Sequence, residues 1–229
     1  MVFDLQPDII VNDRGGLPGD FSIAEQKIEA AGEGRAWETC MTSNGAWGYV
    51  RSGENWKTSR SLIGSLITCA RGGGNFLLTI GPRADGSVPE GSVKVPEEVG
   101  RWMSRDGDTI YGSERCKVVR SNYMNFTRKG NTLFMCVYRW PGSTLILSRM
   151  KSKVRSARWV SSGKPVQFEQ AREMDPREPA IEIPIYRIKF TGLPQERPEE
   201  YPVLAAEFER APRAEQDLKY SRWERKRIS

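Results

Sequence analysis

The chain has 229 residues, of which 38% are hydrophobic and 28% are charged, and its formal net charge is +6. This composition is typical of a globular protein that can bury a core, and it excludes an intrinsically disordered chain. No apolar run approaches the ~20 residues that a membrane-spanning helix needs, so we expect no membrane partner. The densest basic cluster, residues 222–227, holds one aromatic residue. We therefore expect a basic solvated surface rather than nucleic-acid binding.

The sequence contains no histidine, which excludes a Ser-His or Cys-His catalytic pair and most transition-metal sites. Its cysteines are Cys40, Cys69, Cys116 and Cys136. None of them forms a Cys-x-x-Cys pair, so we expect no metal site. Each lies in an apolar stretch, which predicts buried free thiols, although three disulfide pairings stay open.

Apolar strands and helices alternate in the first half of the chain. The predicted elements are a buried strand at 7–11, a strand at 37–41, a helix at 59–71, a strand at 75–80 and a helix at 96–106. The first helix places Leu62, Leu66 and Cys69 on one face and ends at three glycines. Strands that are apolar on both faces are typical of a parallel sheet covered by helices.

From residue 112 onwards, apolar and polar residues alternate instead. The alternating runs are residues 131–138, 143–147, 154–160, 181–185 and 201–208. Turn signals separate these runs, a pattern typical of an antiparallel sandwich. Residues 170–180 are rich in charge and proline and predict a long loop. The sequence thus predicts an α/β part over 1–112, a β-sandwich over 113–210 and a charged tail over 211–229.

An ordered series of short motifs identifies a family. The series is Val-Asn-Asp-Arg at 11–14, Gly-Asp-Phe at 19–21 with Glu25, Trp-Glu-Thr-Cys-Met at 37–41, Trp-Gly-Tyr at 47–49, Gly-Gly-Asn-Phe-Leu-Leu-Thr-Ile-Gly-Pro at 73–82, Asp-Gly-Asp-Thr-Ile-Tyr-Gly at 106–112 and Trp-Pro-Gly at 140–142. It resembles the C-terminal half of the α-L-fucosidases of glycoside hydrolase family 29, over about residues 7–210. The resemblance implies the C-terminal part of a (β/α)8-type catalytic barrel over 1–112, followed by the antiparallel β-sandwich.

The same resemblance implies a retaining glycosidase that releases L-fucose from fucosylated oligosaccharides or glycoconjugates and needs no cofactor. Such enzymes use two carboxyl groups roughly 5–5.5 Å apart. The family nucleophile is an Asp in a Trp-x-Asp segment, and the sequence contains no such segment. We therefore expect a site completed across subunits, for which Asp13, Asp20 and Glu38 of a neighbouring copy are candidates. The alternative is a non-catalytic remnant that binds sugar or acts as an oligomeric scaffold.

Removing the first strands of a barrel leaves two open sheet edges and an uncovered apolar interior. Exposing several hundred Å2 of apolar surface at ~25 cal/mol per Å2 is too costly for a stable monomer. We expect a homo-oligomer, or a first half that is rearranged or molten.

Two carboxylates are candidates for catalysis. Glu25 matches the family acid/base that follows the Asn-Asp-Arg loop, and a partly apolar site there would suit a proton donor. The alternative for Glu25 is an exposed surface residue. Glu38 is the second candidate acid, or else the structural partner of an arginine at a strand end.

Two further residues are candidates for binding the sugar. Arg14 matches an arginine that hydrogen-bonds fucose, and its alternative is a salt bridge to Asp13 or Asp20. Trp47 matches an aromatic residue that packs on the fucose methyl group and ring face, and its alternative is ordinary core packing.

Two positions depart from the family pattern. Gly15 stands where the family usually has Trp, and Thr79 replaces a common Asn. The first change predicts a wider pocket or a looser loop, so fine substrate specificity does not carry over.

Overall fold

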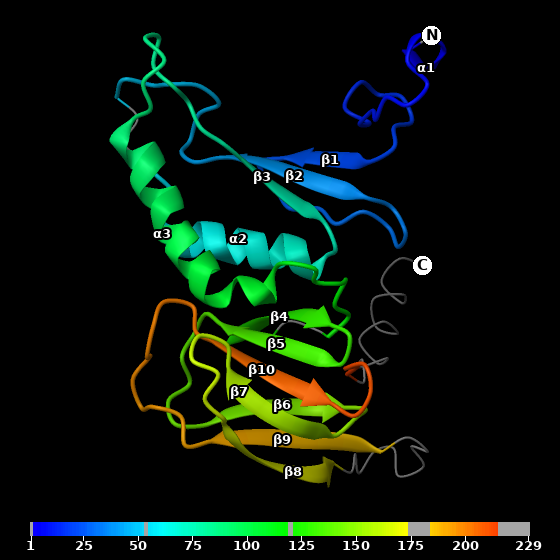
Figure 1. Cartoon of the computed structure of the whole chain (residues 1–229), viewed down its shortest axis with the longest axis vertical. Helices are drawn as coiled ribbons and strands as arrows, with labels where there is room; N and C mark the ends of the chain where they lie inside the picture. The colour runs from blue at the N-terminus through cyan, green and yellow to red at the C-terminus, as the bar shows by residue number, and fades with distance from the viewer. Residues whose placement is uncertain (1, 53–54, 119–120, 174–183, 215–229) are drawn as a thin grey trace, which may run out of the picture. The chain divides into compact units, whose positions relative to one another are not determined.

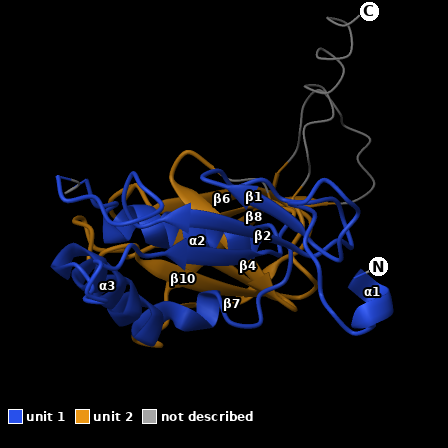
Figure 2. Cartoon of the chain, turned by 90° about the horizontal axis from the view of Figure 1, so that it is seen from above, with its two compact units in different colours: residues 1–116 blue, residues 117–229 orange. Residues whose placement is uncertain are grey.

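The computed structural model describes residues 2–52, 55–118, 121–173 and 184–214 (Figure 1). The chain divides into two compact units, Met1–Cys116 and Lys117–Ser229 (Figure 2). Within the described residues, helices occur only in the first unit, and the second unit consists of antiparallel strands. Most of the predicted charged tail, residues 215–229, lies outside the described residues.

The first unit is built on a parallel sheet of three strands in the order β1-β2-β3. The strands are β1 (Ser22–Glu25), β2 (Trp37–Thr42) and β3 (Asn75–Thr79). The predicted strands at 37–41 and 75–80 are confirmed as β2 and β3. In the register of the sheet, Cys40 lies opposite Glu25 on one side and opposite Leu77 on the other.

Two long helices accompany this sheet. The predicted helix at 59–71 is confirmed as α2 (Ser59–Arg71), whose N-terminus is capped by the Thr58 hydroxyl accepting from the Ser61 backbone N–H at 3.2 Å. Helix α3 (Glu90–Asp106) begins six residues before the predicted proline, so Pro96 lies inside the helix. The unit also holds the short α1 (Val2–Leu5) and the 3-10 helix η1 (Gly107–Thr109).

The connection from α2 to β3 closes tightly around one indole ring. Trp37 is 2% exposed, and its Nε1 donates to the Gly72 carbonyl at 3.1 Å. A Cβ on Gly74 would overlap the Trp37 ring, and Gly73 has a φ of +69°, which favours glycine. The Arg115 Nε donates to the same Gly72 carbonyl at 2.9 Å. The three glycines therefore let the chain turn directly against the indole.

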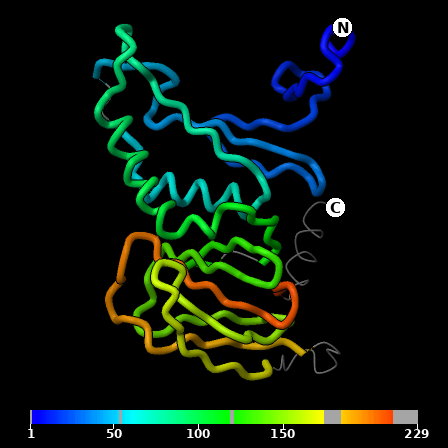
Figure 3. The backbone as a smooth tube through the Cα atoms, in the orientation of Figure 1, coloured from blue at the N-terminus to red at the C-terminus, as the bar shows by residue number. Residues whose placement is uncertain are grey.

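The predicted buried strand at 7–11 is wrong. Residues 7–10 are exposed and belong to no strand, and the isolated parallel bridge nearby joins Asn12 to Phe21. Figure 3 shows this segment as the blue tube that leads from α1 towards β1. An apolar run becomes a buried strand only where neighbours cover it, and no described element covers Ile10, which is 75% exposed.

The second unit holds two antiparallel sheets, with strand orders β4-β5-β10-β7 and β6-β9-β8. The strands are β4 (Met124–Lys129), β5 (Thr132–Val137), β6 (Leu145–Met150), β7 (Val154–Trp159), β8 (Gln167–Glu173), β9 (Ile185–Thr191) and β10 (Val203–Phe208). Strands from both sheets supply fully buried side chains, such as Phe126 and Met135 from the first and Ile188 and Phe190 from the second. Both sheets thus contribute side chains to the apolar core of the unit.

Most of the predicted alternating runs in this unit are strands, and two elements differ. Residues 170–173, expected in a long loop, belong to β8, which pairs with β9 although its side chains are mostly exposed. Strand β4 also lacks a simple alternating pattern, because four consecutive residues from Met124 are buried. The predicted run at 181–185 falls largely outside the described residues.

All four cysteines are buried and free, which confirms the prediction from their apolar surroundings. Burial raises the pKa of the Cys69 thiol to about 12, although a hydrogen bond with Thr39 opposes that shift. The thiolate is the reactive form of cysteine, so the folded chain should protect the Cys69 thiol strongly.

The contact between Gly74 and Trp37 predicts a stability change. Gly74→Ala should destabilise the chain by about 1–3 kcal/mol, because the added methyl group displaces a buried indole. Gly100→Ala is the matched control: nothing lies within 4 Å of its added Cβ inside α3, so it should stabilise by about 0.5–1 kcal/mol. Urea unfolding followed by tryptophan fluorescence measures both. Equal midpoints for the two variants would contradict the packing.

Thiol counting tests whether the first unit is ordered in solution. Ellman's reagent at pH 8 should find no reactive thiol in the native chain and four after denaturation, since all four are buried. Rapid reaction of Cys40, Cys69 and Cys116 without Cys136 would instead show that only the second unit is packed.

Candidate active site

The candidate site lies at the edge of the sheet where its parallel strands end. Glu25 is the last residue of β1, and Trp47 lies in the loop that follows β2. Because the carboxyl ends of parallel strands meet at one edge, Glu25 and the loop that carries Trp47 both start from that edge of the sheet.

Arg14 and Glu25 form a direct ion pair. The Arg14 Nη2 lies 2.6 Å from the Glu25 Oε1, and the two side chains are 52% and 44% exposed. The arginine therefore does not form the alternative salt bridge to Asp13 or Asp20. The structure thus brings together two of the four predicted site residues.

The loop that carries Arg14 is held by its own aspartates. Asp13 Oδ1 accepts from the Ile23 backbone N–H at 3.1 Å, and Asp20 Oδ2 accepts from the Val11 backbone N–H at 2.7 Å. A hydrogen bond from the Ser22 hydroxyl, the Ile23 bond and the nearby Arg35 guanidinium hold the pKa of Asp13 below its usual value. These bonds hold the loop against the start of β1, and from this position the Arg14 side chain contacts Glu25 at the end of the strand.

Trp47 is 47% exposed, so ordinary core packing does not describe it. Its loop is anchored where β2 ends, because the Ser43 backbone N–H donates to the Thr79 carbonyl at 3.0 Å. A Cβ on Gly81 would meet the backbone of Gly48 at 2.6 Å, so this loop also presses against the segment that follows β3. The indole is therefore presented to solvent by a loop fixed at both neighbouring strands.

A polar network at the same edge was not predicted from the sequence. The Gln26 Nε2 donates to Thr42 Oγ1 at 2.9 Å, and the Lys57 Nζ donates to the Thr42 carbonyl at 2.5 Å. Burial lowers the pKa of Lys57, because water is partly removed from its ammonium group. These three residues are far apart in the sequence and follow no periodic pattern, so nothing in the sequence predicts that they form a network.

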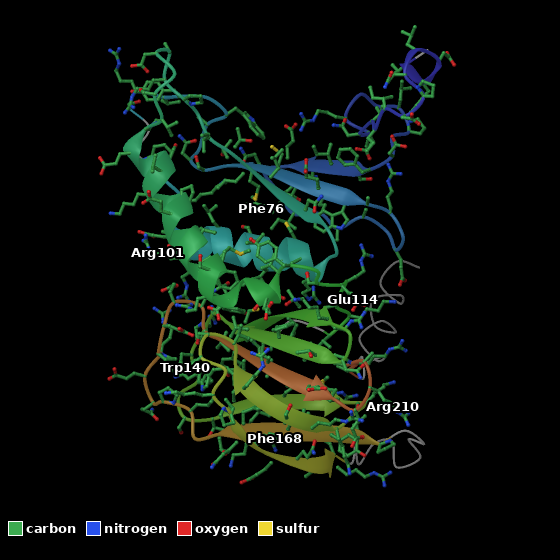
Figure 4. The ribbon with its side chains drawn as sticks, viewed as in Figure 1. Phe76, Arg101, Glu114, Trp140, Phe168 and Arg210 are labelled. Carbon is green, nitrogen blue, oxygen red and sulfur yellow. The ribbon has the colours of Figure 1, made fainter. Side chains whose placement is uncertain are left out.

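Glu38 lies away from this edge. It is the second residue of β2, two positions before Cys40, which is opposite Glu25, so it lies about 6–7 Å further back along the strand. It borders a cavity of about 610 Å3, which is also lined by Leu66, Ala70, Gly73, Gly74, Asn75, Phe76 and residues 110–113. Figure 4 labels Phe76, whose ring lies on the side of the sheet where α2 runs. The structure therefore separates Glu38 from the pair of Arg14 and Glu25.

No cluster of three or more His, Cys, Asp or Glu side chains in the described residues could hold a metal ion. No helix in that part of the chain combines the length and the apolar character needed to cross a bilayer.

Comparison with known proteins gives one consistent result. A family model described as alpha-L-fucosidase matches residues 1–108. An alpha-L-fucosidase of Dictyostelium discoideum is 32% identical over 153 residues, which are 61% of this chain and 33% of that protein. The tissue alpha-L-fucosidase of Homo sapiens is 28% identical over 153 residues, covering 60% of this chain and 32% of its own length.

Solved structures agree with the sequence matches. An alpha-L-fucosidase isoenzyme 1 from Paenibacillus thiaminolyticus superposes with a TM-score of 0.75 at 27% identity, over 91% of this chain and 52% of that chain. A Thermotoga maritima alpha-fucosidase, solved with a mechanism-based inhibitor, gives 0.70 at 25% identity over 89% of this chain and 46% of its own. The chain therefore spans about a third to a half of the length of these proteins. The family model, the relatives and the solved structures thus all identify α-L-fucosidases, of glycoside hydrolase family 29, as the proteins that this chain resembles.

Proposed function

We propose that this chain is the C-terminal portion of an α-L-fucosidase that hydrolyses fucosylated oligosaccharides or glycoconjugates with retention, with Glu25 as its acid/base. The observation that carries the proposal is the contact of 2.6 Å between Arg14 and Glu25. It joins a sugar-binding group and a proton-transfer group at the strand ends, where barrel enzymes carry their chemistry. The resemblance to α-L-fucosidases supplies the reaction class.

We further propose that residues 1–112 are the last part of a (β/α)8-type barrel and that residues 113–210 form a β-sandwich. The parallel order β1-β2-β3 and the intervening helix α2 support the first assignment. The two antiparallel sheets of the second unit support the second. A barrel fragment also accounts for the uncovered sheet face on which Leu77 is 46% exposed.

In this mechanism Glu25 transfers a proton twice. It first protonates the glycosidic oxygen as the aglycone leaves and a second carboxylate bonds to the anomeric carbon. It then removes a proton from the water that releases fucose. The second carboxylate would come from a neighbouring copy, with Asp13, Asp20 and Glu38 as candidates. The first two already accept backbone N–H groups, which favours Glu38.

Arg14 and Trp47 would bind the sugar in this proposal. The planar guanidinium of Arg14 can donate to a fucose hydroxyl while it stays beside Glu25, because it carries five N–H donors. The exposed indole of Trp47 would cover the apolar methyl group and ring face of fucose. Polar contact on one side and apolar contact on the other would orient the glycosidic bond towards Glu25.

A second candidate function is a non-catalytic chain that binds sugar or acts as an oligomeric scaffold. The observation that favours it is the engagement of Asp13 and Asp20 in loop hydrogen bonds, which leaves few carboxylates for a nucleophile. Fucose binding measured by calorimetry without any hydrolysis would select this function over the first.

Substitution of Glu25 tests the catalytic assignment. With phenyl α-L-fucoside, Glu25→Gln should lower kcat by about 10²- to 10⁴-fold, because the amide can neither give nor take the proton. With a dinitrophenyl fucoside the loss in the first step should be smaller, because that leaving group needs no proton. Glu29→Gln is the matched control and should keep full activity, because Glu29 is an exposed carboxylate in the loop after β1, where it pairs with Lys27. Unchanged activity in Glu25→Gln would refute the assignment.

Self-association is the second consequence of the proposal. Parallel sheets are normally covered on both faces, yet Leu77 is 46% exposed in β3, and Leu5 and Leu17 are 80% and 75% exposed. Sedimentation at micromolar concentration should therefore give a species heavier than the 25.9 kDa monomer. Leu77→Asp should shift it towards the monomer, because a carboxylate on the buried interface stays solvated only when the copies separate.

Ile146→Asp is the control for this experiment. Ile146 is 40% exposed on β6 of the second unit, so a general effect of added charge would appear there too. A compact monomer for the unsubstituted chain would contradict the proposed association.

A further inference from the structure

Gln26, the residue directly after Glu25, has an unusual backbone. Its φ is +57°, in the left-handed region that residues with a side chain rarely adopt. Among the described non-glycine residues, only Arg149 and Tyr201 share this feature, and both belong to the second unit. Such conformations persist where the surroundings enforce them, and they are concentrated at functional sites.

Hydrogen bonds to β2 enforce the conformation of Gln26. Its backbone N–H donates to the Cys40 carbonyl at 2.9 Å, which extends the ladder between β1 and β2 by one bond. Its side-chain Nε2 donates to Thr42 Oγ1 at 2.9 Å, and its Oε1 lies 3.5 Å from the Lys57 Nζ. The residue is thus fixed through both its backbone and its amide.

The partners of Gln26 are themselves fixed. The Lys57 Nζ donates to the Thr42 carbonyl at 2.5 Å, and Thr42 Oγ1 lies 2.5 Å from the Asn44 carbonyl. The Lys57 backbone N–H donates to the Ser43 carbonyl at 2.9 Å. Thr42 is fully buried, so the amide of Gln26 reaches a rigid anchor rather than a mobile surface group. We name Gln26, Thr42 and Lys57 the amide clamp.

We infer that Gln26 is a positioning residue for Glu25, which it holds beside Arg14 through the amide clamp. If residue 26 were also extended, the strand would continue past Glu25. The backbone around Glu25 would then have more conformational freedom. The left-handed turn at Gln26 instead ends β1 at Glu25. The clamp then removes rotation about the backbone on the C-terminal side of Glu25. This inference rests on the proposed acid/base role of Glu25.

The residue type supports the inference. Glycine is the ordinary choice at positive φ, and asparagine is the usual alternative. This chain places glycine at nine described positions with positive φ. A glutamine at position 26 is less favourable for the backbone, but its amide is long enough to reach across to Thr42. The glutamine side chain, and not only the backbone turn, is therefore needed at position 26.

The test uses Gln26→Asn in the full chain. Asparagine keeps the amide and tolerates the left-handed backbone, but it is one methylene too short to reach Thr42. With phenyl α-L-fucoside, kcat should fall by about 10- to 100-fold with little change in KM, because a misplaced proton donor slows the chemical step more than it weakens binding. The acidic and basic limbs of the pH–rate profile should also move, which a loss of stability alone would not cause.

Two further variants separate positioning from folding. Gln170→Asn is the matched control, because Gln170 bonds both the N–H and the carbonyl of Val154 in the second unit, and the same shortening there should leave kcat and the pH profile unchanged. Thr42→Val should reproduce the loss seen in Gln26→Asn, and Thr42→Ser, which restores the hydroxyl, should recover most of it. Full activity with an unmoved pH profile in Gln26→Asn would overturn the inference.

A structural measurement keeps the inference testable if the unsubstituted chain proves inactive, the outcome that would count against the proposed function itself. Crystal structures of the unsubstituted chain and of Gln26→Asn should differ at one contact. In the unsubstituted chain, the Arg14 Nη2 should remain within 4 Å of the Glu25 carboxylate. In Gln26→Asn, this ion pair should be broken. Persistence of the ion pair in Gln26→Asn would overturn the positioning role whether or not the chain hydrolyses fucosides.

Discussion

The parallel register between β1 and β2 is the constraint on which the candidate site depends. It sets Cys40 opposite Glu25, so that the Cys40 carbonyl can accept from the next residue, Gln26. It also brings the end of β2, with Thr42, to the same edge as the end of β1. A slip of one residue would move Glu25 to the other face of the sheet and separate all of these groups. The ladder of backbone hydrogen bonds therefore does more for the site than any single side-chain contact.

The two faces of this sheet differ in how far they are buried. On one face, Trp37 is buried against the turn at Gly72 and Gly74, and helix α2 contributes Ile63 and Ile67 to the core. On the other face, Leu77 stays 46% exposed. The covered face stabilises the sheet, while the uncovered face leaves apolar area that another surface can bury. Folding of the first unit and its proposed association would thus use opposite faces of the same sheet.

The periodicity of apolar residues predicted those elements that are determined by nearby residues in the sequence. Helix α2 has a capping threonine, an apolar face and terminal glycines, and its bounds were predicted to the residue. Strand β1 was missed and residues 7–11 were taken for a strand, because Ser22–Glu25 is short and half polar whereas 7–11 is apolar. Whether a short run becomes a strand depends on the neighbours that pair with it, and these are distant in sequence. Strand β8, mostly exposed yet fully paired with β9, illustrates the same limit.

Arg14 and Glu25 were each chosen from the family motifs, but no motif or pattern predicted the ion pair that joins them in the structure. Both side chains remain about half exposed, and an exposed pair contributes only about 0–1 kcal/mol to stability. Because the pair contributes so little to stability, it can rearrange at a small cost in free energy. In the proposed site, a sugar hydroxyl would then take one of the arginine's donors without unfolding the loop. The rigid parts lie behind it, in the aspartates that fix the Arg14 loop and in the buried Thr42 that anchors Gln26. That division, with an adaptable pair held by rigid supports, fits the acid/base role proposed for Glu25, because in a retaining reaction such a carboxylate must meet different partners in the two steps.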